Sequence, residues 1–118
     1  MAMKWCEDQD VKIVNDLGNA IEMNKEFPHL HVPDYMMIAA IQPDDTVELT
    51  HQGDRFWVKV DYVEEVGDNH WEFIGKVTDG LVYSHPFESG DCIAFDGTNI
   101  LNIFSREWKN ELRISPNE

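Results

Sequence analysis

The stretch RFWVKVDYV, residues 55–63, alternates between apolar and mostly charged side chains, a pattern that predicts a β-strand. The side chains expected on the buried face are Phe56, Val58, Val60 and Tyr62. The opposite face carries Arg55, Lys59, Asp61 and, among them, Trp57. A large apolar ring on a charged face is unfavourable in water, so we expect a second layer of the fold, a partner or a ligand to contact Trp57.

The segment HWEFIGKVTDG, residues 70–80, is the predicted antiparallel partner of this strand. Matching the apolar faces requires even positions in the first strand to pair with odd positions in the second, which allows a loop of about two or four residues. Each register leaves one like-charge pair, either Lys59 with Lys76 or Glu65 with Glu72. In both registers Val63 and Ile74 share the outer face with Trp57.

The segment PDYMMIAAI, residues 33–41, predicts a short helix that starts after Pro33 and Asp34 and ends before Pro43. It is apolar almost all round, whereas a helix buried on one side needs only one apolar stripe. Either its own domain covers the helix on two sides, or part of it is a self-association surface. We expect Trp57 to pack under Tyr35, Met36 or Ala39 of this helix, or under the N-terminal segment.

Further strands are expected at residues 12–14, 46–50 and 92–95, and a helix near residues 15–27 that is capped by Asn15 or Asp16. The pattern predicts an α+β fold: a small bent antiparallel β-sheet or partly open barrel with one or two short helices packed on it. We expect one domain over residues 1–118, with a poorly patterned segment 1–26, a β core 27–104 and a C-terminal tail 105–118. The tail contains SREWKNEL, a candidate last helix with Trp108 on its apolar stripe.

The formal net charge is −14, and residues 44–96 hold thirteen acidic and three basic side chains. Such a field repels nucleic acid and anionic membranes, so we expect neither as a partner. The charge serves solubility, or it imitates nucleic acid and binds a basic cleft of another protein. Cys6 and Cys92 lie far apart and form no zinc motif, so we expect free thiols. With no membrane-length apolar run and an acidic N-terminus, the sequence predicts a soluble, cytoplasmic protein.

Chemistry-bearing residues are few. His29 and His31 share one side of an extended chain with Asp34 close behind, which makes them weak candidates for a metal site. His85, before Pro86, is a candidate general base, although a histidine in a turn more often binds a backbone carbonyl. Paired acids lie in turns, and no nucleotide-binding or nucleophile motif occurs. We therefore expect no catalytic residues and no cofactor.

The motifs Arg55-Phe56-Trp57-Val58 and His85-Pro86-Phe87, followed by Gly90-Asp91-x-Ile93 and Phe95, give the chain a wider resemblance. Over residues 27–104 it resembles a family of small bacterial, phage and viral β domains of unknown function. The resemblance implies a compact β domain and supplies no reaction.

We therefore predict a non-catalytic protein-interaction domain that contacts other proteins or a second copy of itself. An acidic inhibitor that mimics nucleic acid is the alternative, and a small enzyme or metal-binding protein is the third possibility. The residues predicted to form interaction surfaces are Tyr35, Met36, Met37, Trp57, Ile74 and Trp108.

Overall fold

The computed structural model describes residues 5–7, 9–14, 16–26, 32–67, 70–82 and 85–104. Three predictions lie outside these residues: the helix over SREWKNEL with Trp108, the pair His29 and His31, and the side chain of Tyr35.

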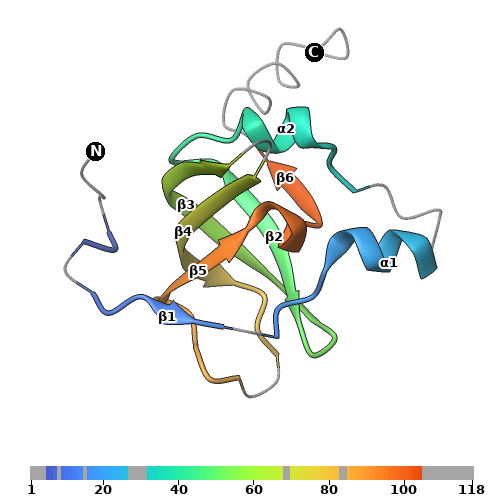
Figure 1. Cartoon of the computed structure of the whole chain (residues 1–118). Coiled ribbons are helices and arrows are strands. Elements are labelled where there is room, and N and C mark those ends of the chain that lie inside the picture. The colour runs from blue at the N-terminus through green and yellow to red at the C-terminus, as the bar shows by residue number, and fades with distance from the viewer. Residues whose placement is uncertain are drawn as a thin grey trace, which may run out of the picture.

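The described chain forms one six-stranded sheet with short helices beside it (Figure 1). The elements in chain order are β1 Lys12–Ile13, α1 Ala20–Glu26, α2 Tyr35–Ala39, β2 Thr46–His51, β3 Asp54–Gly67, β4 His70–Asp79, β5 Cys92–Asp96, the 3₁₀ turn η1 Gly97–Asn99 and β6 Asn102–Phe104. Their order across the sheet is β1-β5-β4-β3-β2-β6.

The prediction of a small α+β fold is confirmed, with two corrections. The sheet is mixed, because β1 runs parallel to β5 while the other neighbouring strands are antiparallel. It is also not a barrel, since the edge strands β1 and β6 do not pair with each other in the described part of the chain. The short strand β6, which hydrogen-bonds to β2, was not predicted.

Both predicted helices exist, but their environments differ from those expected. The Asn19 carboxamide oxygen accepts the Glu22 N–H at 3.0 Å, so Asn19 caps α1 in place of Asn15 or Asp16. The helix α2 starts after Pro33 and Asp34, as predicted, and the Asp34 carboxylate caps it by accepting the Met37 N–H at 2.9 Å.

The pairing of β3 with β4 follows neither predicted register throughout. Near Val60 the two-residue register holds, and Lys59 lies opposite Lys76. A β-bulge at Asp61 then shifts the register by one residue, so that Tyr62 pairs with Ile74. Because one extra residue exchanges the two faces of a strand, Tyr62 moves to the outer face.

Two residues around the bulge explain how the sheet accommodates it. Val63, predicted on the outer face, packs instead against the core. Gly75 lies opposite Val60, and a Cβ there would come within 2.5 Å of Val58 Cγ1 and 2.7 Å of the Lys59 carbonyl oxygen. Only glycine allows this close approach of the two strands.

Asp61 at the bulge is buried, and its carboxylate accepts the N–H of Trp5 at 3.0 Å and of Cys6 at 2.9 Å. Cys6 forms a disulfide with Cys92 of β5, with 5.8 Å between the two Cα atoms. The prediction of free thiols was therefore wrong. Because disulfides are typical of oxidising compartments, the predicted cytoplasmic location loses this support and stays a prediction.

A second attachment holds the N-terminal segment near β5. The Lys12 ammonium donates to the Asp91 carboxylate at 2.8 Å, and this hydrogen bond lowers the pKa of Asp91. The N-terminal segment therefore covers part of the outer face of the sheet, where Lys59 Nζ also lies 4.9 Å from the centre of the Trp5 ring.

The core fills the inner face of the sheet. Buried apolar side chains of β2, β3, β4 and β5 form one cluster with residues from the connecting segments. Its members are Ile41, Val47, Leu49, Phe56, Val58, Val60, Phe73, Val77, Phe87, Ile93, Phe95 and Ile100. The predicted buried face of residues 55–63 is thus confirmed at Phe56, Val58 and Val60, and it ends at the bulge.

We expect purified, air-oxidised protein to show no free thiol when unfolded without reductant. The Cys6→Ala, Cys92→Ala double variant should lose about 2 to 5 kcal/mol of unfolding free energy, because the bridge closes a loop across a sequence separation of 86. Thiol titration and urea unfolding measure the two quantities. Two titratable thiols in the oxidised protein would contradict the disulfide.

Candidate functional site

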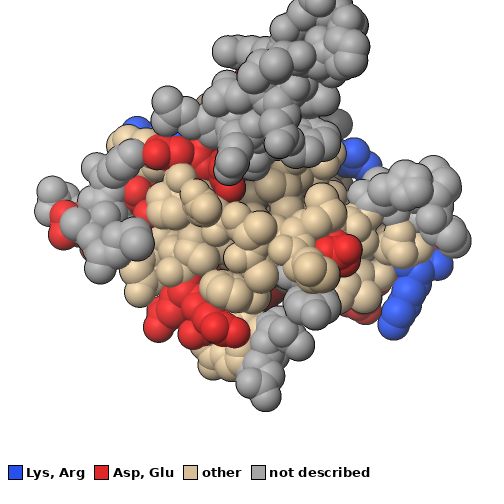
Figure 2. Space-filling model, turned by 90° about the horizontal axis from the view of Figure 1, so that it is seen from above, with Lys and Arg blue, Asp and Glu red and all other residues tan. Residues whose placement is uncertain are grey.

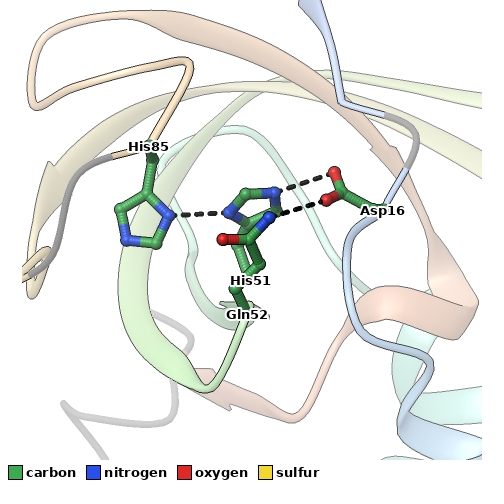
Figure 3. A network of polar contacts seen from close by, with 4 residues as sticks. All are labelled: Asp16, His51, Gln52 and His85. Atoms are coloured by element: carbon green, nitrogen blue, oxygen red, sulfur yellow. Dashed lines mark hydrogen bonds and ion pairs between the residues drawn. The ribbon is translucent and has the colours of Figure 1, made fainter.

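A connected polar site in the described chain is a line of four side chains, Asp16–His51–His85–Asp54. Figure 3 shows its first three members together with Gln52. Asp16 Oδ1 lies 2.8 Å from His51 Nε2, and the Nδ1 atoms of the two histidines lie 2.6 Å apart. His85 Nε2 then lies 2.8 Å from Asp54 Oδ2. We call these four residues the Asp–His–His–Asp network.

The network joins three parts of the chain. Asp16 follows β1, His51 and Asp54 flank the turn between β2 and β3, and His85 lies between β4 and β5. Both imidazole rings are buried, whereas the Asp16 carboxylate at one end is exposed. The network therefore fastens two long connections to one hairpin and reaches solvent at Asp16.

Further donors hold the two carboxylates in place. Gln52 Nε2 donates to Asp16 Oδ2 at 3.2 Å, and the Val82 N–H donates to Asp54 Oδ2 at 2.7 Å. The hydrogen bond from His51, followed by that from Gln52, lowers the pKa of Asp16. Two donors at each carboxylate fit the ionised form of both acids.

The tautomers of the two rings decide which nitrogen donates in each contact. Ionised carboxylates only accept, so the Nε2 atoms of His51 and His85 face them as donors. Between the two Nδ1 atoms either ring can be the donor, and the other ring then accepts.

This arrangement leaves no nitrogen free for chemistry on a substrate. All four ring nitrogens are engaged within the network, and both rings also pack edge-on or stacked against Phe87. A general base or a metal ligand needs an accessible lone pair. We therefore interpret the network as a structural connection between these parts of the chain.

The predictions for His85 and the metal residues can now be compared with the structure. His85 binds two side chains rather than the backbone carbonyl that we expected. Asp34, the described member of the metal candidates, caps α2. No group of histidine, cysteine or acidic side chains within the described ranges has the geometry of a metal site.

The helix α2 exposes two of the predicted interaction residues. Met36 and Met37 are 68% and 52% exposed, whereas Ile38 packs against the core and Ile41 is buried. The described residues of the domain thus do not cover this helix on two sides. A mostly apolar hollow of about 260 Å³ lies between α1 and α2, with Ile21, Ile38 and Trp71 among its walls.

Trp57 has a different neighbour from the one predicted. Its ring packs edge-to-face against Phe104 of β6, with 4.9 Å between the ring centres, and it stays half-buried. The residue paired with it on β2 is Glu48, whose pKa is raised by burial, with Arg55 opposing this effect. The unpredicted strand β6 therefore supplies the cover for which we expected α2 or the N-terminal segment.

Ile74, the remaining interaction candidate, is half-buried on the outer face beside Tyr62. Both line a groove of about 470 Å³ that also reaches β1 and β5. The structure does not bring the candidates together: Met36 and Met37 lie on α2, Trp57 near β6 and Ile74 in this groove.

The sequence analysis did not identify Asp16, His51 or Asp54 as part of a site. They come from separate segments without a local motif, and only the fold brings them together. In the sequence, His51 and Gln52 directly before Gly53 have the composition of an ordinary turn. The available signal was a polar residue, His51, at the end of the apolar face formed by Val47 and Leu49.

No family model, no curated protein and no solved structure matches this chain. The resemblance to small β domains of unknown function therefore stays a prediction. None of the helices in the described ranges has the length and hydropathy needed to cross a membrane.

We expect Asp16→Asn to make stability less dependent on pH in the acid range. The folded-state pKa of Asp16 lies below its ordinary value of 3.8, so its ionised form stabilises the fold above that value. This stabilisation is lost as the pH falls through the lowered pKa. The urea midpoints of wild type and variant should differ at neutral pH and converge below about pH 4.

Asp10→Asn is the matched control, because Asp10 is an exposed acid of the same N-terminal segment. Its midpoint should follow wild type across the pH range. A constant difference between Asp16→Asn and wild type from neutral to acid pH would contradict the stabilising bond to His51.

Proposed function

We propose that this protein is a non-catalytic protein-binding domain that associates with a second copy of itself through the exposed side of α2. One observation carries the proposal: Met36 and Met37 project from a helix whose other side is already packed on the core. Methionine side chains are flexible and apolar, which suits them to protein interfaces.

The surroundings of α2 add to this surface. Ile21 of α1 is 52% exposed and borders the apolar hollow between the helices, whose floor includes Trp71 and Ile100. Apolar surface of this kind marks contact sites in soluble proteins more often than scattered single residues do. A second copy could place its own Met36 and Met37 against this hollow.

The alternative, an acidic inhibitor that mimics nucleic acid, has less support. Three of the central acids are buried acceptors inside the fold, Asp45, Asp54 and Asp61, and add no exposed charge. On the face seen in Figure 2, the acidic side chains form separate groups divided by uncharged surface. A mimic of a phosphate backbone needs a continuous acidic lane.

The proposed assembly predicts a dimer or larger species in solution. Its mass, measured by light scattering across a dilution series, should rise with protein concentration. Added salt should strengthen the assembly, because two chains of net charge −14 repel each other. The Met36→Gln, Met37→Gln variant should be monomeric at concentrations where wild type is assembled.

A matched control replaces two other exposed apolar residues, Val66 and Val82, which are 43% and 77% exposed. The Val66→Gln, Val82→Gln variant should assemble as wild type does. Wild type that stays monomeric at high micromolar concentration, or a control that dissociates equally, would show that α2 is not the interface.

A further inference from the structure

Two parallel rows of side chains cross the outer face of β3, β4 and β5 and line the same groove of about 470 Å³. The acidic row consists of Glu64, Glu72 and Asp96, which pair directly with one another across the three strands. The apolar row lies two residues away from the acidic row on each strand. It consists of Tyr62, Ile74 and Ala94 and continues to Ile13 of β1. Because directly paired residues point to the same face, both rows border one surface.

The acidic row is unfavourable for the free protein. Glu64 and Glu72 lie directly opposite each other and are exposed, and like charges in this position destabilise a sheet. No lysine or arginine of the described chain forms an ion pair with either of them. Asp96 is different, since its Oδ1 accepts the Thr98 N–H at 2.8 Å and caps η1.

The apolar row beside it is also incompletely covered. Ile13 is 71% exposed, and Tyr62 and Ile74 are only half-buried. Uncompensated carboxylates beside exposed apolar side chains are complementary to a chain that carries both cationic and apolar groups. Neither feature is needed by the core, which lies on the inner face of the sheet.

We propose that this groove binds an extended segment of another protein in which arginine alternates with apolar residues. The guanidinium group would bridge Glu64 and Glu72, since its planar donors fit paired carboxylates better than an ammonium does. Tyr62 offers an aromatic face one row away for the same cation. The apolar side chain of the segment would cover Ile74 and Ile13.

The spacing of the two rows favours an extended segment. Residues two apart on a strand are separated by about 6.7 Å, and side chains i and i+2 of an extended peptide have the same separation. Arginine at position i and an apolar residue at i+2 therefore meet the acidic and apolar rows together. This proposal does not depend on assembly through α2.

The test uses the full chain and a fluorescent peptide of repeating Arg-Ser-Leu-Ser units, with binding followed by anisotropy. Wild type should bind, and added salt should weaken the complex. Glu64→Gln with Glu72→Gln should weaken binding at least about tenfold, because a charge-assisted hydrogen bond contributes on that order. Replacing every leucine of the peptide by serine should weaken binding as well, because it removes the contact with Ile74.

The control variant is Glu65→Gln with Glu88→Gln, which removes the same charge from exposed positions outside the groove. Its affinity should stay within about twofold of wild type, because Glu65 points to the opposite face of β3 from Glu64 and neither Glu65 nor Glu88 lines the groove. Met36→Gln with Met37→Gln should also bind the peptide as wild type does, which separates this site from the α2 surface.

A second readout uses the free protein. Glu72→Gln should raise the thermal unfolding midpoint relative to Glu65→Gln, since it relieves the repulsion with Glu64. The proposal is overturned if wild type shows no saturable binding at millimolar peptide, if the control loses as much affinity as the groove variant, or if the leucine-free peptide binds equally well.

Discussion

One extra residue in β3, the bulged Asp61, sets the arrangement of the whole molecule. Before the bulge, even-numbered residues of β3 face the core, and after it Val63 does. At the bulge the Asp61 carboxylate is buried, and the backbone N–H groups of Trp5 and Cys6 satisfy it. A buried charge of this kind is tolerated only with such partners.

The N-terminal segment depends on that contact. Asp61 holds Trp5 and Cys6 on the outer face, and the disulfide then joins Cys6 to β5. From there the chain forms β1 beside β5 and continues to Asp16, where the Asp–His–His–Asp network begins. Every buried side-chain nitrogen and oxygen in the described ranges has a hydrogen-bond partner. The buried acids Asp54 and Asp61 thus bind segments of the chain that are distant in sequence.

The bulge also determines what the surface offers. By exchanging the faces of β3, it places Tyr62 beside Ile74 and Glu64 beside Glu72 on the outer face. An unbroken strand would have sent Tyr62 to the core and divided these rows. The groove is thus a consequence of the same local irregularity that fixes the N-terminal segment.

Sequence pattern predicted the features that depend on nearby residues. The strands around Phe56, Phe73 and Ile93 follow from alternation, and the start of α2 after Asp34 follows from the proline beside it. The bulge could not be predicted, because the parity argument assumed a continuous ladder, and Asp61 looked like one more outward charge. The disulfide was missed because Cys6 and Cys92 lie far apart in sequence, and spacing gives no signal at such a separation.

The candidate site was harder to predict for the same reason. Met36 and Met37 were identified because an apolar helix is a local pattern, and their exposure agrees with one of the two environments considered. His51 joins Asp16 and His85 only after two long connections have folded onto the β2–β3 hairpin. A network made by tertiary structure alone leaves little trace in a single sequence.

The register around Asp61 is tested most directly by cross-strand nuclear Overhauser effects in isotope-labelled protein. The bulge predicts close backbone contacts between Val60 and Gly75 and between Tyr62 and Ile74, with no residue directly opposite Asp61. A continuous ladder, in which Asp61 contacts Ile74 and Tyr62 contacts Phe73, would contradict it. That result would remove the common cause of the N-terminal attachment and of the groove.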